Sequence, residues 1–185
     1  MIKLACFGAG RIGQVHALNA AASPGASLSY IVDPVAGPHA EEIAARTGAS
    51  LTDADTVFAD ATVDGIIIAS STDSHAPLLL RAAEAGKAVF CEKPVSLDFA
   101  QVAEATQSVE ATGIACMLGF QRRYDPSFRQ VRDRIPSGAA GRLEHVAMIS
   151  RDPTPPQRLA GGKRRRQGRG SRSAEAPAPL TQRNR

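Results

Sequence analysis

The residues Glu92-Lys93-Pro94 directly follow the short apolar run AVFC at positions 88–91. Such a run predicts a buried strand, and an acid and a base at its end are candidates for chemistry. The amine of Lys93 can orient a hydroxyl group and favour its deprotonated form. Glu92 can position Lys93, while Pro94 stiffens the turn and is compatible with a cis peptide bond. An ion pair at the surface end of a strand is the alternative interpretation.

A glycine pattern near the N-terminus predicts a phosphate-binding loop. The sequence GAGRIG places Gly8, Gly10 and Gly13 in the order G-x-G-x-x-G, between a predicted strand and a predicted helix. Gly8 permits the tight turn, Gly10 lets a pyrophosphate approach the backbone, and Gly13 lets the helix pack close to the sheet. Unpaired N–H groups at the helix N-terminus attract phosphates. Asp33 ends the second predicted strand, 20 residues after Gly13, and the combination indicates a dinucleotide site.

Asp33 also indicates which dinucleotide is bound. Its carboxylate can accept both ribose hydroxyls and would repel a 2′-phosphate, and the following Pro34-Val35 supplies no compensating arginine. The sequence therefore favours NAD over NADP. Arg11 and Ile12 are expected to line the cofactor, although a surface or packing role is equally compatible with either residue.

The segment ASSTDSH at positions 69–75 follows a continuous apolar strand prediction. Ligands of a doubly wound sheet bind beyond the carboxyl ends of its strands. Ser71, Thr72 and His75 are therefore candidates for contact with the ribose or phosphates of the cofactor. In the alternative interpretation, Ser74 only caps a helix and His75 is solvated.

The elements that must position these residues alternate along the chain. Predicted strands cover positions 2–7, 27–33, 49–51, 65–70, 88–91 and 114–120, and predicted helices cover 12–22, 37–47, 54–58, 74–85, 98–112 and 125–135. This alternation predicts an α/β fold, a Rossmann doubly wound parallel sheet with right-handed crossovers. Because parallel strands end at the same edge of the sheet, Glu92 and Lys93 are expected near the nicotinamide. Glu92 can also hold the ribose that carries the nicotinamide.

Two segments carry more detailed expectations. The strongest helix prediction is 98–112, with Asp98 as N-cap, Gln101 in a capping box and Gly113 as the stop. One helix face is expected to carry Phe99, Val102, Thr106 and Val109. The segment RLEHVAMIS at 142–150 alternates polar and apolar residues, which predicts a half-buried strand of a different sheet.

The composition separates two segments of different charge. The chain of 185 residues has a net charge of +4 and 43% apolar residues. Residues 1–150 contain 12 Lys and Arg against 16 Asp and Glu, a net charge of −4, whereas residues 151–185 contain 10 against 2, a net charge of +8. No run of 18 apolar residues and no signal-peptide pattern occurs, so we expect a cytoplasmic protein without a membrane span.

The other histidines and the cysteines show no metal-site or disulfide pattern. We expect ordinary helix or strand histidines at His16, His39 and His145, because their spacing matches no metal site. The three cysteines lie far apart in apolar runs and form no C-x-x-C pair, so we expect buried, reduced thiols at Cys6, Cys91 and Cys116.

These motifs together resemble the glucose–fructose oxidoreductase, inositol dehydrogenase and rhizopine-catabolism (Gfo/Idh/MocA) family. The resemblance rests on the glycine loop, Asp33 and the segments STDSHAPLLLRAAEAGKAVFCEKPVSLD and GFQRRYDPSF. It covers roughly residues 1–153 and is greatest to inositol 2-dehydrogenases. It implies a two-domain NAD(P)-dependent dehydrogenase that oxidises a ring hydroxyl of a cyclic polyol or sugar to a ketone. Another sugar or polyol dehydrogenase is the alternative within the family.

The resemblance also implies roles for particular residues. Lys93 of the EKP motif contacts the reacting hydroxyl, Arg123 lies at the substrate or nicotinamide side, and Asp152 begins the substrate domain as a further substrate-binding residue. We therefore expect an NAD-binding domain over 1–120 and the start of a truncated substrate domain over 121–153. The proton-accepting histidine of the family, and the sheet that forms its homo-oligomer, have no counterpart in this sequence.

The segment 154–185 has the composition of a disordered basic tail. A shifted reading frame in GC-rich DNA is one explanation, and an arm for nucleic acid or an acidic partner is another, although no aromatic residue is present to stack on bases. The chain is expected to bind NAD with little catalysis. Two further hypotheses are a non-catalytic nucleotide-binding module with a nucleic-acid-binding tail, and an enzyme completed by a separate chain.

Overall fold

The computed structural model describes residues 1–35, 37–139, 141–142 and 144–149, and the chain separates into two units, Met1–Arg142 and Leu143–Arg185. The first unit contains six parallel strands in the order β3-β2-β1-β4-β5-β6. They are β1 (Ile2–Phe7), β2 (Ala26–Val32), β3 (Ser50–Thr52), β4 (Gly65–Ile68), β5 (Ala88–Cys91) and β6 (Cys116–Leu118). This order confirms the predicted doubly wound sheet, with its switch point between β1 and β4.

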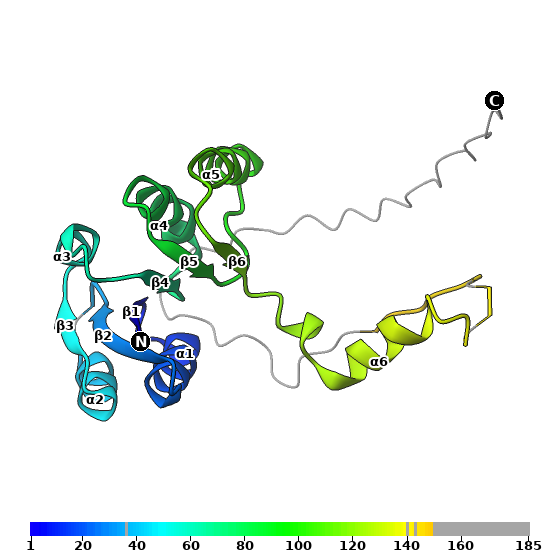
Figure 1. Ribbon diagram of the computed structural model, residues 1–185, viewed down its shortest axis with the longest axis horizontal. Helices are drawn as coiled ribbons and strands as arrows, with labels where there is room; N and C mark the ends of the chain where they lie inside the picture. The colour runs from blue at the N-terminus through cyan, green and yellow to red at the C-terminus, as the bar shows by residue number, and fades with distance from the viewer. Residues whose placement is uncertain (36, 140, 143, 150–185) are drawn as a thin grey trace, which may run out of the picture. The chain divides into compact units, whose positions relative to one another are not determined.

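Helices cover both faces of this sheet, as Figure 1 shows. One face carries α1 (Arg11–Ala22) and α2 (Pro38–Thr47), and the other carries α3 (Ala54–Ala59), α4 (Thr72–Glu84) and α5 (Phe99–Thr112). The short 3-10 turn η1 (Gln121–Arg123) and the helix α6 (Pro126–Arg134) follow β6. The helices and the strands of the sheet all begin and end within two residues of their predicted limits.

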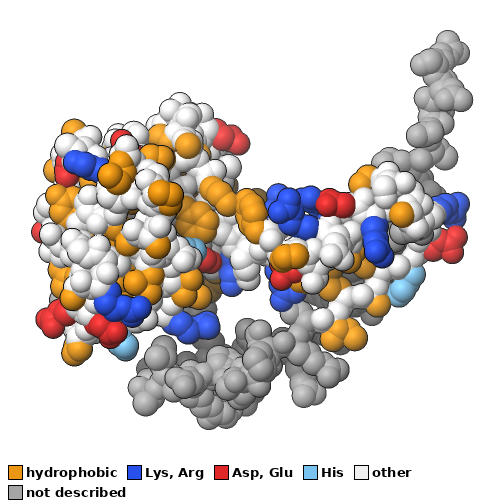
Figure 2. Space-filling view, turned by 60° about the horizontal axis from the view of Figure 1, so that its bottom comes forward, with side chains coloured by type: hydrophobic (Ala, Val, Ile, Leu, Met, Phe, Trp, Pro, Cys, Tyr) orange, Lys and Arg blue, Asp and Glu red, His pale blue; other side chains and the backbone are white. Residues whose placement is uncertain are grey.

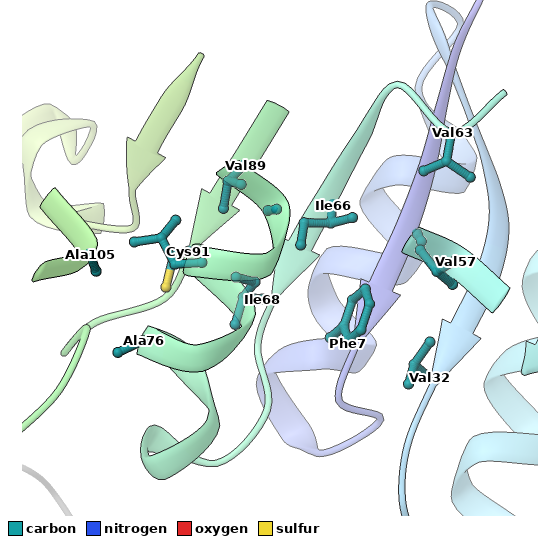
Figure 3. Close-up of a cluster of buried hydrophobic side chains, with 13 residues drawn as sticks. Phe7, Val32, Val57, Val63, Ile66, Ile68, Ala76, Val89, Cys91 and Ala105 are labelled. Atoms are coloured by element: carbon teal, nitrogen blue, oxygen red, sulfur yellow. The ribbon is translucent and has the colours of Figure 1, made fainter. Parts of the chain in front are cut away.

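The apolar side chains of the central strands fill the core on both sides of the sheet. All four residues of β4 are buried, as its uninterrupted apolar run predicts. Ile66 and Ile68 belong to the cluster beneath α3, α4 and α5 (Figure 3). Ile67 belongs to the opposite cluster, with Cys6 and Ile31. Alternate residues of one strand thus stabilise the two halves of the core.

The helix α4 begins two residues earlier than predicted. Ser71 is the N-cap residue, and Ser74 lies inside the first turn, where its hydroxyl donates to the Ser71 carbonyl at 2.7 Å. The prediction that Ser74 caps this helix is therefore wrong. The bond from Ser74 to Ser71 shows the cause, because a serine hydroxyl can donate to a backbone carbonyl three residues earlier as readily as it can cap.

The helix α5 confirms one predicted contact and corrects two. Asp98 caps it by accepting the Ala100 N–H at 2.8 Å. The capping box is wrong, because Gln101 accepts the Ser96 hydroxyl at 2.8 Å instead. Phe99 was expected on the buried face but is 85% exposed, whereas Ala105 is fully buried. The small Ala105 side chain allows α5 to pack closely beside α4.

The α1 side of the sheet is incompletely covered. A hollow of about 570 Å³ lies over β4, β5 and β6, and its lining includes Ile67, Phe90 and Met117. The strand β6 forms the edge of the sheet. Cys116 on this strand is exposed, so the prediction of a third buried thiol is wrong. Cys6 and Cys91 are buried as predicted.

The described residues of the segment 142–150 do not form the strand predicted there. Residues 144–149 have no regular secondary structure. A strand needs a neighbour that satisfies its backbone hydrogen bonds, and no strand of the described part pairs with this segment. Residues 150–185, which include Asp152 and the predicted tail, lie outside the described residues. No helix of the described ranges is long and apolar enough to cross a bilayer.

Candidate functional site

Three loops meet at the carboxyl edge of the sheet because the backbone ladder continues one residue past each strand. The Gly8 N–H donates to the Val32 carbonyl at 2.8 Å, and the Ala69 N–H donates to the Phe7 carbonyl at 2.8 Å. In the same way, the Glu92 N–H donates to the Ile68 carbonyl at 2.8 Å. The glycine loop, the loop after β4 and the turn that contains Lys93 therefore lie side by side.

The three motif glycines have different surroundings. Gly8 has φ +98°, and a Cβ atom there would lie 2.6 Å from the Ser70 Cα. A Cβ atom on Gly13 would lie 1.9 Å from the Gly8 carbonyl oxygen. In contrast, a Cβ atom on Gly10 would meet no atom within 4 Å. Gly8 and Gly13 are thus required for packing, whereas Gly10 leaves open space at the N-terminus of α1, where phosphates bind favourably.

The carboxylate of Asp33 connects the end of β2 to this loop. Its Oδ2 atom accepts the Ala9 N–H at 2.7 Å, and its Oδ1 atom accepts the Val35 N–H at 2.9 Å. Each carboxylate oxygen can accept more than one hydrogen bond. Asp33 can therefore hold the loop and still accept hydrogen bonds from a ligand.

A cavity of about 1010 Å³ lies at this edge of the sheet. Its lining contains Gly8, Gly10, Asp33 and Ser71, which the sequence predicted, and also Ser70 and Arg81. No pattern in the sequence indicates Arg81, because it lies in the last turn of α4, where a basic residue is common at the negative end of the helix dipole. Its Nη2 atom donates to Asp55 at 2.6 Å, and its guanidinium lies 4.3 Å from the centre of the Phe58 ring.

His16, expected to be an ordinary helix residue, contacts the turn after β5. The Glu92 Oε1 atom lies 2.9 Å from the His16 Nε2 atom, and the Glu92 Oε2 atom accepts the Lys93 N–H at 3.2 Å. The His16 ring lies against Phe90, with ring centres 4.9 Å apart. The Lys93–Pro94 peptide bond is cis. His16 is the sixth residue of α1, and its partner Glu92 lies 76 positions later in the chain, so no local signal in the sequence indicates this contact.

The comparisons with known proteins identify the family. A family model described as "Oxidoreductase family, NAD-binding Rossmann fold" (Gfo/Idh/MocA) matches residues 2–120. The chain belongs to this family. It is 41% identical to inositol 2-dehydrogenase of Rhizobium meliloti over 155 residues. This alignment covers 84% of this chain and 47% of that protein. It is 36% identical to scyllo-inositol 2-dehydrogenase (NAD(+)) of Bacillus subtilis, over 82% of this chain and 45% of that protein.

Solved structures give the same result for this Gfo/Idh/MocA chain. A myo-inositol dehydrogenase of Corynebacterium glutamicum superposes with a TM-score of 0.71 at 41% identity, over 78% of this chain and 43% of that chain. The scyllo-inositol dehydrogenase of Lactobacillus casei, with bound NAD(H) and scyllo-inositol, superposes with a TM-score of 0.72 at 30% identity. The superposition covers 76% of this chain and 42% of that chain. The chain spans about half the length of the curated relatives it matches.

Within this Gfo/Idh/MocA chain, the other predicted site residues lie outside the lining of the cavity. Arg11, Ile12 and Thr72 stand in the first turns of α1 and α4. Lys93 is exposed, and its amine forms no hydrogen bond or ion pair within the described ranges. Arg123 is exposed in η1, with its guanidinium 5.7 Å from the centre of the Phe120 ring. Figure 2 shows Lys and Arg side chains gathered over the segment that contains η1 and α6.

His75 is neither solvated nor part of the cavity lining. Its side chain is only 2% exposed. The Nδ1 atom lies 2.8 Å from the Pro94 carbonyl oxygen, and the Nε2 atom lies 3.0 Å from the Ser70 carbonyl oxygen. Both ring nitrogens thus face main-chain acceptors. His39 faces the Gln14 side chain at 3.3 Å, and no cluster of metal-ligating side chains occurs in the described part of the chain.

Proposed function

We propose that this chain is the nucleotide-binding half of an NAD-dependent dehydrogenase of the inositol 2-dehydrogenase type. The reaction oxidises a ring hydroxyl of a cyclic polyol or sugar to a ketone. The observation that supports it most strongly is the meeting of the glycine loop, Asp33 and the turn of Lys93 at one edge of the sheet. Residues 1–120 form the cofactor domain in this proposal, and residues 121–153 begin the substrate domain.

The residues present fit a dinucleotide. The open space at Gly10 and the N–H groups at the start of α1 can receive the pyrophosphate. Asp33 and Ser71 line the cavity from opposite loops and can hold the adenosine half. The charge of Asp33 supports NAD over NADP. Arg81 lines the same cavity, but its guanidinium is already paired with Asp55 and Phe58, so it does not offset that charge.

Lys93 has the exposed amine that the chemistry requires. When bound, the nicotinamide ring would accept the hydride that leaves the substrate carbon. The Lys93 ammonium would donate a hydrogen bond to the substrate oxygen and stabilise its negative charge as the proton departs to another base. Because the relatives extend over about twice the length of this chain, we propose that residues 1–185 alone bind NAD and turn over little polyol.

Calorimetric titration of the folded chain with NADH tests this proposal. We expect saturable binding at one site, and binding of NADPH weaker by about tenfold or more, which corresponds to about 1.4 kcal/mol. A well-folded chain that releases no heat with NADH would overturn the proposal. Equal affinities for both cofactors would overturn only the preference for NAD.

A further inference from the structure

Two main-chain carbonyl groups face the two nitrogens of one buried imidazole. The Ser70 carbonyl comes from the loop after β4, and the Pro94 carbonyl comes from the turn that contains Lys93. Their oxygens lie 3.0 and 2.8 Å from His75, whose side chain is 2% exposed. The ring thus connects a loop that lines the cavity to the turn of the reactive lysine.

Carbonyl oxygens only accept hydrogen bonds, so the protonation state of the ring determines how many of them it can satisfy. A neutral imidazole has one N–H group and would leave its other nitrogen lone pair against an oxygen. An imidazolium has two N–H groups and satisfies both carbonyls, and its hydrogen bonds are stronger because the donor is charged. A buried nitrogen and a buried carbonyl oxygen that face each other with no hydrogen atom between them are unfavourable, because neither is satisfied by a hydrogen bond.

We infer that His75 is a positioning residue for Lys93, and that its doubly protonated form clamps the Ser70 and Pro94 carbonyls together. Loss of one proton frees one of the two carbonyls and loosens the turn. The consequence for catalysis rests on the proposed function, because it assumes that Lys93 is the reacting amine. The hydrogen bonds themselves do not depend on it.

The charges around His75 act in both directions. The positive end of the α4 dipole opposes a cation in the first helical turn. Asp73 in the same turn favours one, whereas burial of the ring opposes one, because the charged form loses its contact with water. The two carbonyl acceptors are the geometric feature on which the inference of a doubly protonated ring rests.

Nitrogen NMR of the whole chain tests the clamp directly, because the sequence contains only four histidines. We expect both His75 nitrogens to carry protons at low pH. As the pH is raised from about 5 to about 9, a range in which histidines titrate, the amide signals of Lys93 and Val95 should shift together with the ring. Titration of His39 should leave these amide signals unchanged. A single neutral tautomer of His75 throughout, with no change at the turn, would overturn the inference.

Trace acetylation of the amines provides a second readout, since the chain has only four lysines. We expect the labelling of Lys93 to show a pH step that coincides with the titration of His75 and is lost in His75→Gln. Lys3 should show no such step in either protein. If His75→Gln fails to fold, the NMR titration of the unaltered chain decides alone. If the pH step in Lys93 labelling is present but the chain does not bind NADH, the proposed function is wrong and this inference stands. If the chain binds NADH but Lys93 labelling shows no pH step, this inference is wrong and the proposed function stands.

Discussion

The Asp33 Oδ2 atom accepts the main-chain N–H of Ala9 at 2.7 Å, so the acid that ends β2 also fixes the glycine loop. Asp33→Ala should therefore have two effects. Loss of hydrogen bonds to a charged acceptor should lower the free energy of unfolding by about 1–3 kcal/mol, and NADH affinity should fall by more than about tenfold. Urea denaturation without cofactor and calorimetry measure the two effects separately.

Asp64→Ala is a matched control for this variant. The Asp64 carboxylate also accepts a main-chain N–H at 2.7 Å, from Lys3, and it does not line the cavity. We expect a similar loss of stability with unchanged NADH affinity. An Asp33→Ala protein that is destabilised but binds NADH normally would assign Asp33 to the fold alone.

Gly10 and Gly13 should respond differently to alanine. At Gly10, the N-cap of α1, a methyl group has open space, so the loss of stability should be about 0.5–1 kcal/mol. The same methyl group would occupy the approach to the pyrophosphate and weaken NADH binding by about tenfold or more. Gly13→Ala places a Cβ atom 1.9 Å from a carbonyl oxygen and should cost about 3 kcal/mol or more. Thermal melting distinguishes the two, and a Gly10→Ala chain with full NADH affinity would contradict the role of Gly10.

Lys93→Ala should leave NADH affinity within about twofold of the parent chain, which is less than about 0.4 kcal/mol. The reason is that its exposed amine is assigned to the substrate oxygen rather than to the cofactor. In a protein that carries the full length of the relatives, the same change should lower kcat far more than NADH affinity. Lys3→Ala serves as the control in both measurements. A large loss of NADH affinity in Lys93→Ala would reassign Lys93 to the cofactor.

Burial raises the pKa of Cys6 and of Cys91 to about 12, so both thiols stay protonated at ordinary pH. The thiolate is the reactive form. We therefore expect iodoacetamide at mildly alkaline pH to label Cys116 first in the folded chain, although burial also raises the pKa of that thiol. Unfolding in urea should equalise all three rates. Fast labelling of Cys91 in the folded chain would show that the core opens near β5.

The hollow over β4, β5 and β6 should bind hydrophobic dyes and promote association, because an apolar surface of this kind favours contact with other apolar groups. Met117, which is 42% exposed, lies in its lining. Met117→Lys should reduce dye fluorescence and the light scattering of concentrated solutions. Leu97→Lys adds the same charge at a side chain that is 89% exposed and lies outside the hollow. Equal effects of the two variants would show that charge alone is responsible.

The sequence predicted the features that depend on local pattern. The buried run of β4 and the glycines at 8, 10 and 13 appear where periodicity and turn chemistry placed them. The errors concern tertiary context. Cys116 lies in an apolar run, yet it is exposed because β6 is an edge strand.

The histidines show the same limit. His16 lies 76 positions before Glu92 in the chain, and no local pattern predicts a contact between residues so far apart. The burial of His75 depends equally on two carbonyl groups from separate loops. The roles of Arg123 and Asp152 stay predictions, as does the cytoplasmic location.

Arg81 lies in the wall of the cavity that we propose for the dinucleotide, where it contacts Asp55 and the ring of Phe58. A neutral residue at position 55 would release its guanidinium, and a serine at position 33 would remove the opposing carboxylate. Two substitutions could therefore redirect this scaffold toward a phosphorylated ribose, so discrimination between the two cofactors is separable from the ability to bind either. Evolution can therefore change which nicotinamide cofactor such a fold uses while its phosphate-binding loop stays the same.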